Sequence, residues 1–194
     1  MPHSKSDITI RLANEDDIQP VLSLLEQELG QNWIYAKHLK AAIADDLLYI
    51  ADDQGEMAGY VLLRMFKKGG FVKELKGQPY DMPQDLRIAD EHETIGFIEA
   101  VTTSPAHRGK GAATKLISAA ETALKQAGAT VITALGWKPE KVNIGPILYA
   151  AGFQDRAEFD NLWYKETSKE DAADCPGCGK PPCECGAVLF SKSV

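Results

Sequence analysis

The sequence lacks the features that would place the chain in a membrane or on nucleic acid. No apolar run approaches the ~18 residues of a membrane-spanning helix, and no dense block of lysine and arginine occurs. Residues 1–7 lack the apolar core of a secretion signal. The composition, with 44% hydrophobic residues and a net charge of −7, is ordinary for a soluble globular domain. We therefore expect a cytoplasmic protein without membrane or nucleic-acid partners, whose acidic surface favours cationic ligands.

Cysteine is absent before residue 175, and all four cysteines fall within the stretch 175–185. Disulfides are disfavoured in the cytoplasm, so the spacing Cys-x2-Cys followed by Cys-x-Cys favours a metal site. Four thiolates complete the tetrahedral shell of a structural zinc ion, although the Cys-x-Cys arm is shorter than the spacing of about two to four residues that most such sites use on both arms. A reduced tail without metal and a disulfide formed on purification are the alternatives. The predicted zinc ligands are Cys175, Cys178, Cys183 and Cys185.

The chain also lacks the two commonest nucleotide-binding motifs. The ATP-type loop Gly-x4-Gly-Lys-Ser/Thr does not occur. Gly109, Gly111 and Thr114 come close to the dinucleotide fingerprint, which needs an acidic residue about 20 positions further on. Residues 129–139 contain neither Asp nor Glu. This absence argues against a nicotinamide site.

What the sequence does contain is a strand, a glycine-rich turn and a helix in direct succession over residues 95–128. The first part is apolar and β-branched, and the helix after Gly111 has apolar residues at i, i+3 and i+4. The first turn of a helix offers unpaired backbone N–H groups and the positive end of its dipole. Gly109 and Gly111 allow close approach to the backbone, and Arg108 and Lys110 add positive charge. This arrangement predicts a diphosphate site.

The turn and the region after it resemble the two motifs of the Gcn5-related N-acetyltransferases, the GNAT superfamily. Arg108-x-x-Gly111-x-Ala113 is similar to the first motif, Arg/Gln-x-x-Gly-x-Gly/Ala. The stretch Asn143–Phe153 resembles the second motif, in which an Asn precedes Leu-Tyr and Gly-Phe. A plain tight turn into a helix is the alternative for the first motif. The resemblance covers about residues 8–166.

The resemblance implies an α/β (α+β) fold with a mixed, mostly antiparallel central sheet of about six to seven strands, flanked by about four helices. The central strand pair of this sheet is expected to splay apart. Because the resemblance leaves the end of the chain out, we expect a GNAT domain at residues 1–166 and a linker with a four-cysteine tail at residues 167–194. Dimers are common in the family, so a homodimer is one expected state.

The activity that the resemblance implies is transfer of the acetyl group of acetyl-CoA to a primary amine by direct attack. The cofactor arm is expected to pair with the main chain of the strand before the turn. The acceptor is an unidentified small-molecule or peptide amine. The alternative is a non-catalytic acyl-CoA-binding or zinc-bearing adaptor on the same fold. The expected cofactor residues are Val101, Thr103, Arg108, Gly109, Lys110, Gly111, Ala112, Ala113 and Asn143, the last of which either braces the cofactor or caps a helix.

Two side chains are candidates for proton transfer. An alkyl amine with a pKa of ~10.4 is mostly protonated at neutral pH and is then no nucleophile. A carboxylate can take its proton, directly or through water. Glu99, on a mostly apolar predicted strand, is the candidate base; exposure to solvent or pairing with a lysine are the alternatives. Tyr149 matches the position of the family's usual acid and is expected to protonate the leaving thiolate. Packing of its ring in the core is the alternative.

The remaining segments are expected to surround this site. Trp33 and Tyr35 are expected either beside the substrate or packed against the sheet. Residues 66–94 form a long insertion that is either a flap over the acceptor pocket or a disordered surface loop, and His107 is expected on an exposed loop. The other expected strands are 8–12, 47–51, 57–63, 129–135, 152–157 and 162–166, and the other expected helices are 18–29, 32–44 and 144–151.

Overall fold

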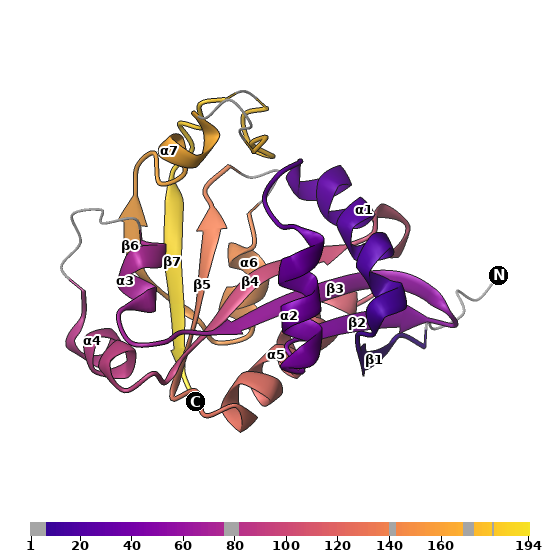
Figure 1. Cartoon of the computed structure of the whole chain (residues 1–194), viewed down its shortest axis with the longest axis horizontal. Coiled ribbons are helices and arrows are strands. Elements are labelled where there is room, and N and C mark those ends of the chain that lie inside the picture. Colours follow the sequence, from indigo (N-terminus) through magenta and orange to yellow (C-terminus); the bar gives the residue numbers. More distant parts are fainter. Residues whose placement is uncertain (1–6, 76–81, 140–142, 169–172, 180) are drawn as a thin grey trace.

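One seven-stranded sheet organises the fold (Figure 1). The computed structural model describes residues 7–75, 82–139, 143–168, 173–179 and 181–194. The strand order is β1-β2-β3-β4-β5-β7-β6, and every neighbouring pair is antiparallel except β4 and β5. The strands are β1 (Thr9–Leu12), β2 (Leu48–Asp53), β3 (Glu56–Met65), β4 (Ile95–Thr103), β5 (Val131–Trp137), β6 (Gln154–Phe159) and β7 (Ala187–Ser193).

Seven α-helices and two short 3-10 helices accompany the sheet in the described residues. The expected fold class, a mixed and mostly antiparallel sheet flanked by helices, is confirmed. In the same residues, no helix combines the length and the apolar character needed to cross a membrane. The helices are α1 (Ile18–Leu29), α2 (Ala36–Ala44), α3 (Gly70–Glu74), α4 (Gln84–Glu91), α5 (Ala112–Gln126), α6 (Gly145–Ala150), α7 (Tyr164–Thr167), η1 (Glu15–Asp17) and η2 (Pro105–His107).

The helices cover both faces of the sheet. Helices α1 and α2 pack over β2, β3 and β4, whereas α5 lies on the opposite face (Figure 1). Helices α3 and α4 share the face of α1 and α2 but lie over the β5–β7 part. Because successive strand residues point to opposite faces, Val131 packs with α3 and α4 while its neighbour Ile132 packs with α5. The sheet therefore buries apolar residues on both faces.

Strands β4 and β5 separate part-way along their length. They pair from Ile95 with Val131 to Ile98 with Ala134. Strand β4 nevertheless continues to Thr103, and β5 continues to Trp137. This geometry confirms the expected splayed pair. The separation leaves main-chain groups of β4 beyond Ile98 available on the side that β5 has left.

Strand β7 corrects the expected closing hairpin. Residues 162–166 contain a turn and the start of α7 rather than a strand, and the antiparallel partner of β6 is β7. Strand β7 lies between β5 and β6. Its side chains suit this interior position, because Leu189 is buried on one face of the sheet and Phe190 on the other. The division of the chain at residue 166 stays a prediction, although β7, which follows it, belongs to the same sheet.

The insertion at residues 66–94 corrects a second expectation. Where the structure describes it, this segment is not a disordered loop, because α3 and α4 bury Phe71 and Leu86 against the sheet. Helix α4 is also tied to β6 by the ion pair between Asp85 and Arg156, with an N–O distance of 2.8 Å. Helix α2 begins at Ala36, later than expected, and the described residues before it form bends.

Candidate active site

A groove lies between the splayed end of β4 and helix α6 and has a volume of about 410 Å³. Glu28 and Leu29, at the end of α1, form part of its wall. Asn143 lies in the groove and also caps α6, because its Oδ1 accepts the N–H of Gly145 at 2.7 Å. The predicted cofactor residues that line the groove are Val101, Thr103, Arg108, Ala113 and Asn143.

The turn before α5 is exposed and unobstructed. Arg108–Gly111, which include Lys110, are exposed. The φ angles are +74° at Gly109 and +84° at Gly111, in the left-handed region that glycine adopts without strain. A Cβ at either glycine would meet no atom within 4 Å, whereas Ala112 is buried beneath the turn. The first-turn N–H groups of α5 therefore lie at an accessible helix end, as a phosphate site requires.

The guanidinium of Arg108 has an acidic partner in this groove. It donates to the carboxylate of Glu28, which α1 supplies. A phosphate in the groove would compete with Glu28 for Arg108, and the Glu28 charge would repel it. No local sequence pattern indicates this ion pair, because the two residues lie 80 positions apart.

A buried histidine braces the loop before α5. His107 is 4% exposed, so the expectation of an exposed loop histidine is wrong. Its Nδ1 lies 2.6 Å from Ser104 Oγ, and its Nε2 lies 3.4 Å from Asp53 Oδ2. Because Asp53 ends β2, the imidazole links the phosphate-site loop to the β2–β3 hairpin. This link fixes the position at which α5 begins.

A second cavity, of about 330 Å³, adjoins the groove, and Leu29 lines both. We call it the acceptor pocket. Its wall includes Trp33 and Tyr35. Trp33 also packs against two buried clusters, as the alternative expected. Contact of either residue with a substrate stays a prediction. The pocket is both aromatic and acidic. Its aromatic residues are Trp33, Tyr35, Phe97, Trp137 and Trp163, and its acidic residues are Glu74, Glu99 and Glu166.

Glu99 enters the acceptor pocket because of a β-bulge. In the ladder between β3 and β4, Leu62 pairs with Ala100 and Leu63 pairs with Ile98, so Glu99 has no partner in register. A bulge of this kind adds one residue to a strand and redirects its side chain. Glu99 and Ala100 consequently line the same cavity although they are consecutive.

The surroundings of Glu99 favour a proton acceptor. Only 30% of its side-chain surface is exposed, and its Oε2 lies 3.6 Å from Arg64 Nε. Burial raises the pKa of Glu99, the charge of Arg64 lowers this pKa, and the charge of Glu74 raises it; the net shift is upward. A carboxylate whose pKa moves towards neutrality is a better general base near pH 7.

The three tryptophans of the pocket form one cluster. Trp137 and Trp163 stack with ring centroids 4.4 Å apart, and Trp33 meets Trp137 edge-on at 5.5 Å. The buried Nε1 of Trp137 has no hydrogen-bond partner among the described residues. The cluster joins three segments that are distant in sequence, so only the fold brings it together.

Tyr149 lies apart from Glu99. It is 51% exposed, and its ring meets Phe190 edge-on at 5.5 Å. A hydrogen bond to Asp155 raises the pKa of Tyr149. Tyr149 is not among the described residues that line the groove or the acceptor pocket. Its role as the acid stays a prediction.

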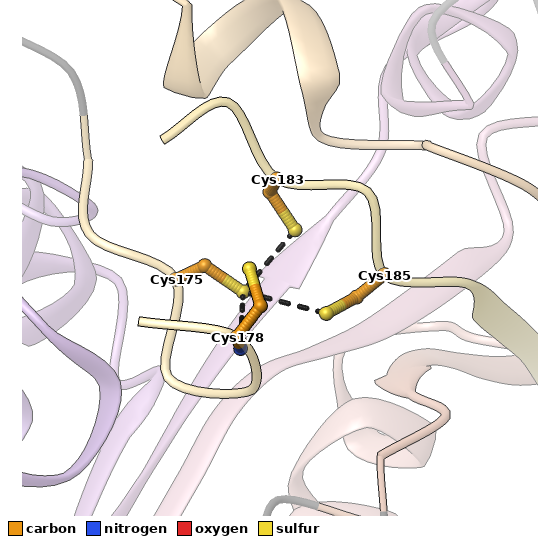
Figure 2. A group of neighbouring side chains, drawn as sticks. All are labelled: Cys175, Cys178, Cys183 and Cys185. Atoms are coloured by element: carbon orange, nitrogen blue, oxygen red, sulfur yellow. Dashed lines mark hydrogen bonds between the residues drawn. The ribbon is translucent and has the colours of Figure 1, made fainter. Parts of the chain in front are cut away.

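The four cysteines come together between α7 and β7 (Figure 2). Their Sγ atoms all lie within 4.8 Å of one another. Cys175 and Cys183 are buried, whereas Cys178 is exposed. In the described part of the chain, no other group of three or more His, Cys, Asp or Glu side chains is placed to hold a metal ion. The predicted ligands are thus assembled, and zinc itself stays a prediction.

Comparison with known proteins gives one match at the level of a family. The model of the acetyltransferase (GNAT) family matches residues 15–144, which is more than half of the chain. The curated protein sequences compared with the chain give no match. The match includes β4, the turn and α5, which carry most of the predicted cofactor residues.

Many solved structures share the fold. Arylalkylamine N-acetyltransferase 2 from Aedes aegypti matches at 14% identity with a TM-score of 0.61, over 96% of this chain and 99% of that chain. YncA from Salmonella typhimurium was solved with its cofactor acetyl-CoA. It matches at 15% identity with a TM-score of 0.63, over 96% of this chain and 93% of that chain. A polyamine N-acetyltransferase from Drosophila melanogaster, which forms N-acetylagmatine, matches at 11% identity with a TM-score of 0.64, over 97% of this chain and 100% of that chain. At these identities the likeness concerns the fold alone.

Proposed function

Because the chain belongs to the GNAT acetyltransferase family, we propose that it transfers the acetyl group of acetyl-CoA to a primary amine. The observation that supports this most is the junction of the groove with the acceptor pocket at Leu29. Along β4, Glu99 in the pocket is two residues before Val101 in the groove, a distance of about 7 Å on an extended strand. A base and an acyl carrier would therefore meet at this junction.

The groove suits the acyl carrier, which supplies an acetyl group activated as a thioester. The accessible N-terminus of α5 offers N–H groups to a diphosphate. The free side of β4 beyond Ile98 offers main-chain groups to the amides of the carrier's arm. Val101 and Thr103 contribute through their backbone, and Arg108 and Lys110 contribute charge. This assignment uses the residues that the sequence predicted.

Glu99 is the general base in this proposal. It takes the proton of the acceptor ammonium, directly or through one water molecule, so that the amine nitrogen can attack the thioester carbon. The new C–N bond replaces the C–S bond, and the departing thiolate takes up a proton. Arg64, at 3.6 Å, favours the ionised form of the partly buried Glu99 carboxylate. No acyl-enzyme is involved, because the four cysteines lie outside the groove.

The acceptor pocket favours a cationic amine carried on an apolar or aromatic body. Its carboxylates attract an ammonium group, and its indole rings offer both apolar surface and cation–π contacts. A substrate with its own carboxylate would meet three acidic side chains and be repelled. The arylalkylamine and polyamine acetyltransferases that share the fold act on amines, which supports this class.

Thiol release from acetyl-CoA with matched acceptors tests the proposal. Tryptamine and phenethylamine should be acetylated, and the carboxylate-bearing counterparts tryptophan and phenylalanine should show kcat/KM lower by about 10-fold or more, which corresponds to about 1.4 kcal/mol. Mass spectrometry of the product would confirm the N-acetyl group. Turnover that favours the amino acids would contradict the assignment of the pocket.

A binding protein without turnover is the second candidate. The ion pair between Glu28 and Arg108 in the groove favours it, as does the absence of Tyr149 from the described residues that line either cavity. Calorimetry with coenzyme A separates the two candidates when it accompanies the acceptor assay. Binding of acetyl-CoA without turnover of small amines, polyamines or peptide N-termini would support the binding protein.

A further inference from the structure

We propose that the four cysteines bind one structural zinc ion, and that this ion holds the tryptophan wall of the acceptor pocket in place. The metal site is independent of the proposed function. Only its effect on acceptor binding rests on that function.

The spacing of the sulfur atoms matches one tetrahedral zinc site (Figure 2). Cys175 Sγ lies 3.2 Å from Cys183 Sγ and 3.7 Å from Cys185 Sγ. A tetrahedral ion with Zn–S bonds of about 2.3 Å separates its sulfurs by about 3.8 Å. A disulfide requires about 2.05 Å. All four sulfurs lie within 4.8 Å of one another, so a single ion can reach every one after small adjustments.

The first arm of the cluster is a tight turn built for a thiolate. The N–H of Cys178 points to Cys175 Sγ at 3.4 Å, and the N–H of Gly179 donates to the Cys175 carbonyl at 2.8 Å. Gly179 has a φ of +68°, which a residue with a Cβ adopts only with strain. An N–H directed at a sulfur stabilises negative charge on it. The geometry of this turn therefore suits a sulfur that ligates a metal ion.

The short second arm has a structural explanation. The chain from Cys183 to Cys185 has no helical structure and leads into β7. In an extended segment, residues i and i+2 point to the same side, so one intervening residue is enough to direct both thiols at one point. Cys183 is anchored there, because its N–H donates to Thr167 Oγ1 at 2.6 Å. Sulfur-only ligands in this geometry select zinc over harder cations.

The same segment holds Trp33 directly. The Nε1 of Trp33 donates to the carbonyl of Asp174 at 2.6 Å, and Asp174 precedes the first ligand, Cys175. The N–H of Asp174 in turn donates to the Gln31 carbonyl at 3.3 Å. The two chains approach so closely that a Cβ on Gly30 would lie 2.8 Å from the Cβ of Asp174. The first arm thus fixes the segment that carries Trp33.

The second arm holds another part of the tryptophan cluster. Thr167, which accepts the N–H of Cys183, donates its own hydroxyl to the Trp163 carbonyl at 2.8 Å. Trp163 stacks on Trp137, and both line the acceptor pocket. Each arm of the cysteine cluster therefore contacts one side of the pocket wall. Loss of the ion would release both sides together.

Metal analysis of the full chain tests the site. Protein purified without an affinity tag that binds metal should contain one zinc per chain, and cobalt(II) should give the spectrum of a tetrahedral tetrathiolate site. Cys178→Ser should lose most of the zinc, whereas Glu184→Gln, an exposed change between two ligands, should retain it. No zinc, and no uptake of zinc or cobalt(II) after reduction, would overturn the proposal. A disulfide between any two of the four cysteines, found in protein purified under reducing conditions, would also overturn it.

Intrinsic fluorescence tests the link to the pocket without any assay of activity. The chain has three tryptophans, and all three belong to the pocket wall. Chelation should shift their emission to longer wavelength, and zinc, but not magnesium, should restore it. If amines are turned over, chelation should also raise the acceptor KM about fivefold or more, while the Kd for coenzyme A stays within about twofold. Zinc bound with unchanged fluorescence would disprove the link while leaving the metal site standing.

Discussion

Arg64 lies between two carboxylates of the acceptor pocket, with its Nε 3.6 Å from Glu99 and its terminal nitrogen 2.7 Å from Glu74. The single positive charge is shared, so it compensates neither carboxylate fully. Burial therefore remains the largest influence on the pKa of Glu99. This balance leaves the pKa of Glu99 above its ordinary value and keeps the attraction of the pocket for cations.

Glu99→Gln tests the assignment of the base. The amide keeps the shape of the side chain but cannot accept the ammonium proton, so kcat/KM should fall about 10²- to 10⁴-fold at neutral pH. The loss should shrink as the pH approaches the pKa of the acceptor, because the free amine then needs no base. Steady-state rates from neutral to alkaline pH measure this. Glu74→Gln, in the same wall, is the control and should change KM more than kcat.

The pH profile of the unmodified protein carries a second prediction. Glu99 must be ionised to act, and its pKa lies above the ordinary 4.5. Activity should therefore be present above this raised pKa and fall as the pH decreases through it. Arg64→Met removes the charge that lowers the pKa of Glu99, so the acidic limb of kcat/KM should move to higher pH. A limb that does not move, in a variant that melts normally, would exclude Glu99 as the titrating group.

Glu28→Gln should tighten the binding of coenzyme A. The change removes a negative charge from the groove and releases Arg108 to meet a phosphate group. Because Arg108 is largely exposed, the gain should be modest, about two- to fivefold in Kd, or below about 1 kcal/mol. Calorimetry at low and high salt measures it. Glu26→Gln, at an exposed position on the same helix, is the control and should leave the Kd for coenzyme A nearly unchanged. Weaker binding of coenzyme A by Glu28→Gln would show that the ion pair helps to form the site.

His107→Ala should weaken both the fold and the phosphate site. The variant leaves Ser104 and Asp53 without the imidazole that joins them, which should lower the free energy of unfolding by about 1–3 kcal/mol. Urea unfolding measures this loss. The Kd for coenzyme A should rise several-fold because the start of α5 is less well fixed. His92→Ala, at an exposed position, should stay within about 0.5 kcal/mol.

Tyr149→Phe tests the acid that the sequence suggested. The hydroxyl is bonded to Asp155 and the side chain lies outside both cavities, so kcat should fall less than about threefold. Single-turnover kinetics with saturating acetyl-CoA measure the effect on the chemical step. A fall of about 100-fold in kcat, with unchanged affinity for coenzyme A, would support the motif's implication that Tyr149 protonates the leaving thiolate.

The sequence predicted the elements whose signals are local. Helix α1 runs from Ile18 to Leu29 as expected, because its apolar period and flanking residues define both ends. The first motif also placed Arg108 and Ala113 in the groove. The strand β7 was missed because its apolar run, residues 187–190, is short, does not alternate, and follows a segment rich in cysteine, proline and glycine. The homodimer and the cytoplasmic location stay predictions.

The parts of the site that escaped the sequence depend on tertiary contacts. Glu28 reaches Arg108, and Trp33 reaches Asp174, only after α1 has packed against the sheet. The bulge that turns Glu99 into the pocket follows from the register of β3 against β4, which no single segment encodes. Periodicity reports which face of an element is buried. It does not report which side chain from a distant segment will pack against that face.

The interior place of β7 has a consequence for how the protein is made. A ribosome releases β5 and β6 well before residues 187–193 that must fit between them. Until then both strands expose unpaired main-chain edges, the usual starting point for association between nascent chains. The cysteine segment leaves the ribosome just ahead of β7. Early binding of a zinc ion there would hold the start of β7 near its partners and speed its pairing with β5 and β6.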